Sequence, residues 1–480
     1  MSKEHSRQAV RRAADTYGLT LDDEAVERYA AELDATTEAL GMLEATDPED
    51  MPATELNEGS DAHNALRYTF SLSDGGTVEG PLSDCRLGVK DNLAVAGVPM
   101  TCGSAAMSYT PEFHATVVRR LIDAGGDVSA TTNMDEFAYF TTGETCAHGA
   151  IENPAVDGAV PGGSSSGSGA AVAAGHLDAA LGSDTAGSVR IPASYCGVVG
   201  LKPTHRSVPR FGFVDLAPSL DHIGVLAESV ALVGDVFEVI AGPDRRDPST
   251  VGMPTPDVTV PDAVDGNQVG VVEEAMDGAD EGVREQVESA VETLEDAGVA
   301  VDRVSLPTFE VAPLALLATT NVEFADLLAN DGQVYATGTG HSEGLRAALA
   351  TLDISKLGDN VTSQLLVGGG LLETTGGRHY VAAQRVRETF TQEVDEALGS
   401  YEALVLPTTP TTAPLFGTVT DQAAFSRTIS HTAPFNLTGN PALSVPCGTA
   451  DNQPVSCQFV TARHDESTAL ALGSVLERSL

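Results

Sequence analysis

The sequence predicts an α/β fold with parallel strand pairing, and three observations support that prediction. The chain has 480 residues, of which 42% are apolar, enough to form one large α/β core. Residues 269–272, 282–297 and 299–306 follow one another as strand, helix and strand, a βαβ unit that implies parallel pairing. Residues 115–125 and 128–131 again place a strand after an amphipathic helix.

An N-terminal helical arm is predicted to precede the main domain. Residues 4–44 carry apolar residues at helical spacing, with Gly18 closing a first helix and a second beginning near Asp22. Residues 45–64 are rich in Asp, Pro, Asn and Glu, which is typical of a linker. We therefore expect the arm and linker over residues 1–65 and the main domain over residues 66–480. Within that domain, residues 308–400 are expected to be mostly helical.

Charge is the most unusual property of the composition. The chain has 69 acidic and 26 basic residues, a net charge of −43, and its lysines are limited to Lys3, Lys90, Lys202 and Lys356. This balance indicates a halophilic source, because at molar salt the Debye length is about 3 Å and self-repulsion is screened. A disordered acidic chain is disfavoured by the apolar content. A negative field repels nucleic acid, so no direct DNA or RNA binding is expected.

The sequence shows no targeting, membrane or metal pattern. The first 18 residues are charged throughout, so no signal peptide is expected, and there is no run of 18 apolar residues to cross a membrane. The six cysteines form no CxxC pair, which favours a reducing cytoplasm. The 11 histidines show no metal-site spacing. We therefore expect a cytoplasmic protein with no metal and no cofactor.

A stretch rich in glycine and serine, residues 161–204, is the most informative part of the chain. It reads PGGSSSGSGAAVAAGHLDAALGSDTAGSVRIPASYCGVVGLKPT. Its apolar flanks disfavour a flexible linker. A phosphate cradle would have Lys after its glycines, but Gly167 is followed by Ser168. Residues 163–167 match the G-x-S-x-G of a nucleophile elbow around Ser165, but Pro161 is a poor end for the strand that an elbow requires.

The whole stretch resembles the amidase signature family, in which a glycine/serine-rich segment precedes a D-x-G-G-S-x-R-x-P segment. The resemblance covers roughly residues 80–475 and implies a large mixed, mostly parallel sheet with helices on both faces. It also implies that Ser188 is the nucleophile, that Ser164 in a cis peptide relays the proton, and that Lys90 is the base. Lys90 matches a V-x-[IV]-K-D-N segment at a predicted strand end. Lys202 is the rival lysine, but the family gives it no catalytic role.

The oxyanion of the reaction would be held by backbone N–H groups of the turn before α-helical residues 191–196. The four residues of that turn are Thr185, Ala186, Gly187 and Ser188. Ala186 stands where the family usually has Gly, so a positive φ there would be strained. Asp221 and His222 are adjacent in the chain and are interpreted as structural, not as parts of a Ser-His-Asp triad.

The resemblance gives a first hypothesis for function: an amidohydrolase that converts linear carboxylic amides to acid and ammonia through an acyl-serine intermediate. The expected partners are a small-molecule amide and, at most, a second copy of the chain in a homodimer. The N-terminal arm favours this branch, the broad-specificity amidases. A catalytically inactive binding protein would need the loss of a triad residue, and none is lost.

The alternative hypothesis is the A (glutaminase) subunit of a tRNA-dependent amidotransferase. A glutamine site needs a partner for the substrate's α-carboxylate, and Arg is the natural one. The matching stretch, residues 360–366, offers Ser363 and Gln364 and no cation. Arg378, Arg385 and Arg387 lie further on and leave this alternative open.

Overall fold

The computed structural model describes residues 3–40, 55–73, 80–255, 258, 264–334 and 343–479, and it divides the chain into two units after Asp50. The first unit contains helices α1 (Lys3–Thr16) and α2 (Asp23–Leu40), which confirms the predicted N-terminal helices. Gly18, with φ of 66°, follows α1 as expected. Ala14, Val26 and Ala30 form the buried apolar positions of these helices. Residues 45–54, half of the predicted linker, lie outside the described residues, as do residues 41–44 of the predicted helical segment.

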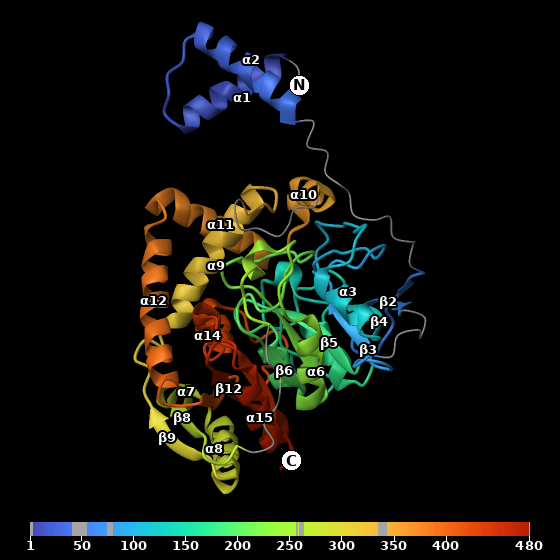
Figure 1. The fold of residues 1–480 in the computed structure, drawn as a ribbon, viewed down its shortest axis with the longest axis vertical. Coiled ribbons are helices and arrows are strands. Elements are labelled where there is room, and N and C mark those ends of the chain that lie inside the picture. Colours follow the sequence, from blue (N-terminus) through green and yellow to red (C-terminus); the bar gives the residue numbers. More distant parts are fainter. Residues whose placement is uncertain are drawn as a thin grey trace. The chain divides into compact units, whose positions relative to one another are not determined.

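The second unit is built around one mixed sheet of twelve strands among the described residues (Figure 1). The order across the sheet is β1-β2-β4-β3-β5-β7-β6-β11-β12-β10-β8-β9. The strands are β1 (Asn57–Glu58), β2 (Leu66–Leu72), β3 (Arg86–Lys90), β4 (Asp127–Thr132), β5 (Ala179–Asp184), β6 (Val199–Lys202), β7 (His222–Ala227), β8 (Gln268–Val272), β9 (Ala300–Val304), β10 (Ala403–Pro407), β11 (Ala442–Ala450) and β12 (Gln453–Thr461).

The sheet confirms the predicted α/β class but is less parallel than expected. Of the eleven neighbouring pairs in the described sheet, four are parallel and seven antiparallel. The predicted βαβ unit is present, since β8 and β9 pair in parallel. The centre is antiparallel partly because β11 and β12 form a hairpin, turning at Asp451 and Asn452 with φ of 51° and 62°. Strand patterns indicate where strands lie but not their direction.

Helices surround this sheet. They are α3 (Thr116–Asp123), α4 (Ser166–Ala173), α5 (Arg190–Cys196), α6 (Val230–Ile240), α7 (Glu273–Gly278), α8 (Glu281–Asp296), α9 (Ala312–Ala329), α10 (Glu343–Ala350), α11 (Asp359–Thr375), α12 (Arg378–Leu398), α13 (Gln422–Ile429), α14 (Pro434–Thr438) and α15 (Glu466–Glu477), with short 3-10 turns at Glu136–Ala138, Pro248–Thr250 and Ile354–Lys356. Helices α9 to α12 confirm the predicted helical segment after residue 308, and Figure 1 shows α9, α11 and α12 gathered along one side of the unit.

Strand side chains alternate between two apolar layers, which places helices on both faces of the sheet. On β10, Val405 joins one core cluster, while Leu404 and Leu406 join another. The first cluster also contains residues of α3, α6, α8 and α15, and the second contains residues of α5, α9, α12 and α14. A third cluster packs α4 against the sheet through residues such as Ala180. The predicted covering of both faces is therefore confirmed.

Candidate active site

Two parallel strands bring the candidate base to the glycine- and serine-rich segment. Lys90 is the last residue of β3, and β3 pairs in parallel with β5 so that Val89 lies opposite Leu181. The carboxyl ends of parallel strands meet at the same edge of a sheet. Ser183 and the end of β5 therefore lie beside Lys90, and α4 begins next to them.

The Lys90 amine is fully buried among hydroxyl groups. Its Nζ lies 2.8 Å from Oγ of Ser164, 3.0 Å from Oγ of Ser165 and 2.8 Å from Oγ of Ser183. Burial lowers the pKa of Lys90 from 10.5 to about 7, although nearby carboxylates, first of all Asp135, oppose the shift. A lysine with this pKa is substantially neutral near pH 7 and has a lone pair with which to accept a proton.

Ser164 is held by a tight backbone arrangement. The Gly163–Ser164 peptide is cis, and the carbonyl of Ser164 accepts a hydrogen bond from the Asp135 amide at 3.2 Å. A Cβ at Gly163 would lie 2.0 Å from Oδ2 of Asp135, so only glycine fits there. The segment around Asp135 thus supports the backbone of the candidate proton relay.

A buried ion pair shapes the turn that carries Ser188. Asp184, at the end of β5, accepts hydrogen bonds from the amides of Gly187 and Val189 at 2.8 and 3.2 Å and from Arg190 at 2.9 and 3.0 Å. Burial alone would raise the pKa of Asp184, but Arg190 and the hydrogen bonds lower it to about 2. Arg190 is also fully buried and donates to the carbonyl of Thr432 at 3.0 Å. This network fixes the turn from both sides.

Ser188 and Ser164 are brought together through the backbone. The Ser165 amide donates to the carbonyl of Ser188 at 3.1 Å. No direct hydrogen bond joins the two hydroxyls of Ser188 and Ser164 in the described part of the chain. Lys90 therefore hydrogen-bonds directly to the Ser164 side chain. Ser188 is linked to this segment through its main-chain carbonyl, which is bonded to the residue after Ser164.

Three of the four predicted oxyanion donors are available. The Gly187 amide is taken by Asp184, whereas those of Thr185, Ala186 and Ser188 have no acceptor among the described residues. Ala186 does not have a positive φ, so the strain anticipated for a non-glycine residue does not arise. The glycine requirement falls on Gly187, with φ of 132°.

The pocket beside Ser188 is lined mainly by apolar groups. Its walls come from Ala138, Tyr139, Phe140, Thr141, Thr185, Ala186, Ser188, Leu216, Leu316, Leu317, Thr320 and Phe425. An adjoining hollow shares Tyr139, Phe140 and Phe425 with it and adds Ser363, Gln364 and Asp421. Neither wall contains Lys or Arg among the described residues. Arg387, one of the candidate glutamine partners, instead donates to the carbonyls of Leu437 and Ser219.

One contact at this pocket was not anticipated from the sequence. Asp221, interpreted as structural, accepts a 2.5 Å hydrogen bond from the hydroxyl of Thr185, which lines the pocket. Burial and the neighbouring Asp215 raise the pKa of Asp221. His222 points elsewhere, with Nε2 3.4 Å from Nζ of the rival Lys202. No sequence spacing links Thr185 to Asp221, so only the fold reveals this pair.

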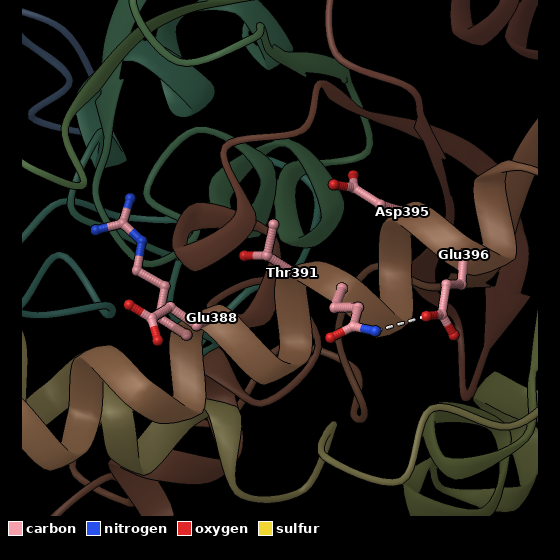
Figure 2. Close-up of a pocket in the computed structure, with 6 residues that line it drawn as sticks. Glu388, Thr391, Asp395 and Glu396 are labelled. Atoms are coloured by element: carbon pink, nitrogen blue, oxygen red, sulfur yellow. Dashed lines mark hydrogen bonds between the residues drawn. The ribbon is translucent and has the colours of Figure 1, made fainter.

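A second hollow lies along the surface of α12 and carries none of the candidate catalytic residues. It is lined by Arg387, Glu388, Thr391, Gln392, Asp395 and Glu396, all from one helix (Figure 2). Gln392 donates to Glu396 at 2.7 Å, the dashed line in Figure 2. One helix face with three carboxylates is a solvated groove, not an enclosed reaction site. Among the described residues, the one cluster of side chains able to hold a metal ion is Asp61, His63 and His176, which line neither this hollow nor the pocket beside Ser188.

Comparisons with known proteins identify relatives of the whole chain. A family model described as Amidase matches residues 34–470. The A subunit of glutamyl-tRNA(Gln) amidotransferase from Natronomonas pharaonis is 43% identical over 425 residues, covering 86% of this chain and 100% of the relative. The crystal structure of the A subunit of glutamyl-tRNA(Gln) amidotransferase from Thermotoga maritima has a TM-score of 0.73 at 30% identity, covering 100% of this chain and 94% of that one. A crystal structure described as an amidase gives 0.72 at 30% identity, covering 100% and 96%.

These relatives correct the expected partners. The sequence predicted a small-molecule amide as substrate, no bound nucleic acid and at most a homodimer. The relative from Natronomonas pharaonis, however, is named as one subunit of a glutamyl-tRNA(Gln) amidotransferase. The prediction relied on net charge, and that argument fails because molar salt screens the field to about 3 Å. The same haloarchaeal relative fits the predicted halophilic source.

Over the described ranges, the chain forms no helix that is both long and apolar enough to span a bilayer. The family model matches residues 34–470, which is most of the chain. The chain therefore belongs to the amidase signature family.

Proposed function

We propose that the chain is the glutamine-hydrolysing A subunit of a tRNA-dependent amidotransferase. The observation that carries this proposal is the 43% identity to the A subunit from Natronomonas pharaonis over the whole of that relative. Such a subunit releases ammonia from the side-chain amide of glutamine for a partner subunit. This is the alternative that the sequence left open, and the relatives favour it over a free-standing amidase.

The proposed chemistry uses the hydroxyl and amine chain of the site. Ser188 Oγ attacks the amide carbonyl and gives its proton to Ser164 Oγ, while Ser164 gives its own proton to the neutral Nζ of Lys90. The lysine then returns a proton through Ser164 to the leaving nitrogen, so ammonia departs and an acyl-serine remains. Water hydrolyses that ester by the same proton path. The 2.8 Å contact between Lys90 and Ser164 supports this sequence of transfers.

The turn before α5 supplies the remaining catalytic group in this proposal. Negative charge on the tetrahedral oxygen is stabilised by the amides of Thr185, Ala186 and Ser188, which have no acceptor among the described residues. Each such donor contributes about 3–4 kcal/mol of transition-state stabilisation. Gly187 shapes the turn, because its amide is held by Asp184.

A second candidate function, hydrolysis of neutral aliphatic or aromatic amides, is favoured by the pocket itself. Phe140, Leu316, Leu317 and Phe425 present apolar surface beside Ser188, and the described lining has no cation for an α-carboxylate. An unpaired carboxylate in such a wall would lose its hydration without compensation. An apolar acyl group would fit without that penalty.

One assay separates these candidates. The purified full-length chain is incubated in molar KCl with glutamine, hexanamide or benzamide, and ammonia release gives kcat/KM for each. A preference for glutamine, with co-purification of other subunits from the source cells, supports the proposed role in an amidotransferase. A preference of at least ten-fold for hexanamide or benzamide overturns it in favour of the second candidate. Ser188→Ala is the control, because turnover that persists in this variant would refute the proposed nucleophile for both.

A further inference from the structure

Three side chains with metal-ligand chemistry meet on a part of the fold that the proposed reaction does not use. Asp61, His63 and His176 each place one ligand atom within 4.8 Å of the others. Asp61 and His63 lie in the turn between β1 and β2, and His176 follows α4. His176 is far from the other two in the sequence, which is why their spacing resembles no metal motif.

Asp61 is held rigidly and retains capacity for a cation. Its Oδ1 accepts from the amides of His63 and Ala65, both at 3.0 Å, and its Oδ2 accepts from Leu66 at 3.0 Å. A carboxylate offers about four acceptor positions. One position on Oδ2 therefore remains, on a group whose place is fixed by the main chain.

The two imidazoles are free to act as ligands. Nδ1 of His63 is buried and has no hydrogen-bond partner within the described structure. The ring centroids of His63 and His176 lie 6.5 Å apart with the planes inclined by 50°. His176 is exposed, so its ring can turn toward its neighbours. A buried polar atom without a partner is unfavourable, and a bound cation would satisfy it.

We propose that Asp61, His63 and His176 bind a divalent transition-metal cation of the zinc class, with water completing the coordination. Two imidazole nitrogens and one carboxylate oxygen suit Zn²⁺ better than Mg²⁺ or Ca²⁺, which take oxygen ligands. With bonds of about 2.0–2.1 Å, tetrahedral ligand atoms lie about 3.3 Å apart. The exposed His176 ring can rotate to bring its nitrogen closer to the other two ligand atoms, and the net charge of −43 draws cations to the protein.

The ion would tie the turn that contains Asp61 to the end of α4. That turn is already linked to the other end of the helix through Asn133, because the carbonyl of Ala65 accepts from the Asn133 amide and the carbonyl of Asn133 accepts from the Gly167 amide, both at 2.9 Å. His176 and the serines before α4 are separated by its eight residues, about 12 Å of helix. The ion thus stabilises the fold and takes no part in amide hydrolysis.

Zinc titration of the full-length protein tests this site. Protein stripped with chelator is dialysed into molar KCl and titrated with ZnCl₂ by calorimetry, and its melting temperature is measured with and without zinc. We expect one ion per chain and a higher melting temperature. His176→Ala, an exposed position, should weaken binding at least ten-fold and remove the thermal shift. His379→Ala, an exposed histidine of α12, should change neither.

The metal site and the proposed function can fail independently of each other. Ser188→Ala protein, expected to be inactive, should bind zinc as the unmodified chain does. Hydrolysis measured well below the melting temperature should be the same with and without zinc. Absence of saturable one-to-one binding, or equal affinity of His176→Ala and the unmodified chain, overturns the metal site.

Discussion

The Nζ atom of Lys90 lies 2.8 Å from the hydroxyl of Ser164, a residue 74 positions away in the chain. This contact joins the end of β3 to the segment before α4 in a fully buried environment. Burial is also what lowers the pKa of Lys90 to about 7. Position and protonation state of the candidate base therefore have the same structural origin.

The first prediction concerns the pH dependence of hydrolysis. Neutral Lys90 is the active form, so kcat/KM should rise as pH increases through about 7 and level off above it. Lys90→Ala should lower the rate by several orders of magnitude. Ammonia release measured across the pH range checks both. A flat profile together with an active Lys90→Ala protein would remove this lysine from the mechanism.

The lowered pKa of Lys90 also determines how this residue makes the free energy of unfolding change with pH. The folded-state pKa of Lys90, about 7, is below its ordinary value of 10.5, so between these two values the unfolded chain binds more protons. Unfolding free energy from this group therefore rises with pH across that window.

The second prediction distinguishes two serines of the site. Ser188→Ala should abolish turnover because the nucleophile is lost. Ser165→Ala should retain measurable activity, since the Ser165 hydroxyl bonds to Lys90 and to the backbone of Ser183, and Ser165 is not among the pocket's lining residues. Steady-state kinetics of the two variants provide the check. An inactive Ser165→Ala with an active Ser188→Ala would support the nucleophile-elbow interpretation instead.

The third prediction compares neighbouring small residues of the oxyanion turn. Gly187→Ala should inactivate and destabilise the enzyme, because its φ is 132° and a Cβ would lie 2.1 Å from Oγ1 of Thr432. Ala186→Gly should be tolerated, because glycine can adopt the backbone conformation that Ala186 already has and adds no side chain. Rates and melting temperatures of both variants test the difference. Equal behaviour of the two would show that the turn is not restricted at Gly187.

The fourth prediction concerns the buried ion pair of Asp184 and Arg190. Asp184→Asn leaves the guanidinium buried without its counter-charge and should cost about 3–5 kcal/mol of unfolding free energy. The control is Glu288→Gln, which removes a 2.7 Å ion pair with Arg303 whose side chains are 45% and 47% exposed. That change should cost less than about 1 kcal/mol. Denaturant unfolding in molar KCl measures both, and equal costs would contradict the structural role of Asp184.

The ion pair of Asp184 and Arg190 also makes the free energy of unfolding depend on pH in the acid range. The pKa of Asp184 is depressed from 3.8 to about 2. Its contribution to stability is therefore complete above the ordinary carboxyl range and is lost as pH falls through the folded-state value.

The fifth prediction follows from the net charge of −43. Self-repulsion among carboxylates should be relieved as salt shortens the Debye length to about 3 Å at molar concentration. The melting temperature should therefore rise from low to molar KCl. Thermal unfolding followed by circular dichroism gives the answer, and an unchanged melting temperature would refute the halophilic adaptation.

The outcome of the sequence predictions depends on the range of the interaction involved. Helices such as α8 and the βαβ unit around it were predictable, because their apolar spacing is local. The prediction of a mostly parallel sheet was wrong in this respect, because β7, β6 and β11 pair in antiparallel directions. Strand direction there depends on which distant segments pair. The expectation of no direct nucleic-acid binding was inferred from net charge, a global quantity that does not describe any particular surface.

Local patterns were sufficient to predict the α/β class and the N-terminal helices, while the resemblance to a family proposed Lys90, Ser164 and Ser188 as candidate catalytic residues. Three relationships required the folded chain: Lys90 reaches Ser164, Asp221 accepts from Thr185, and apolar residues from several helices line the pocket. Burial and side-chain proximity of this kind arise from packing between distant segments. The protonation state of a buried lysine depends on that packing, which no local stretch of sequence specifies.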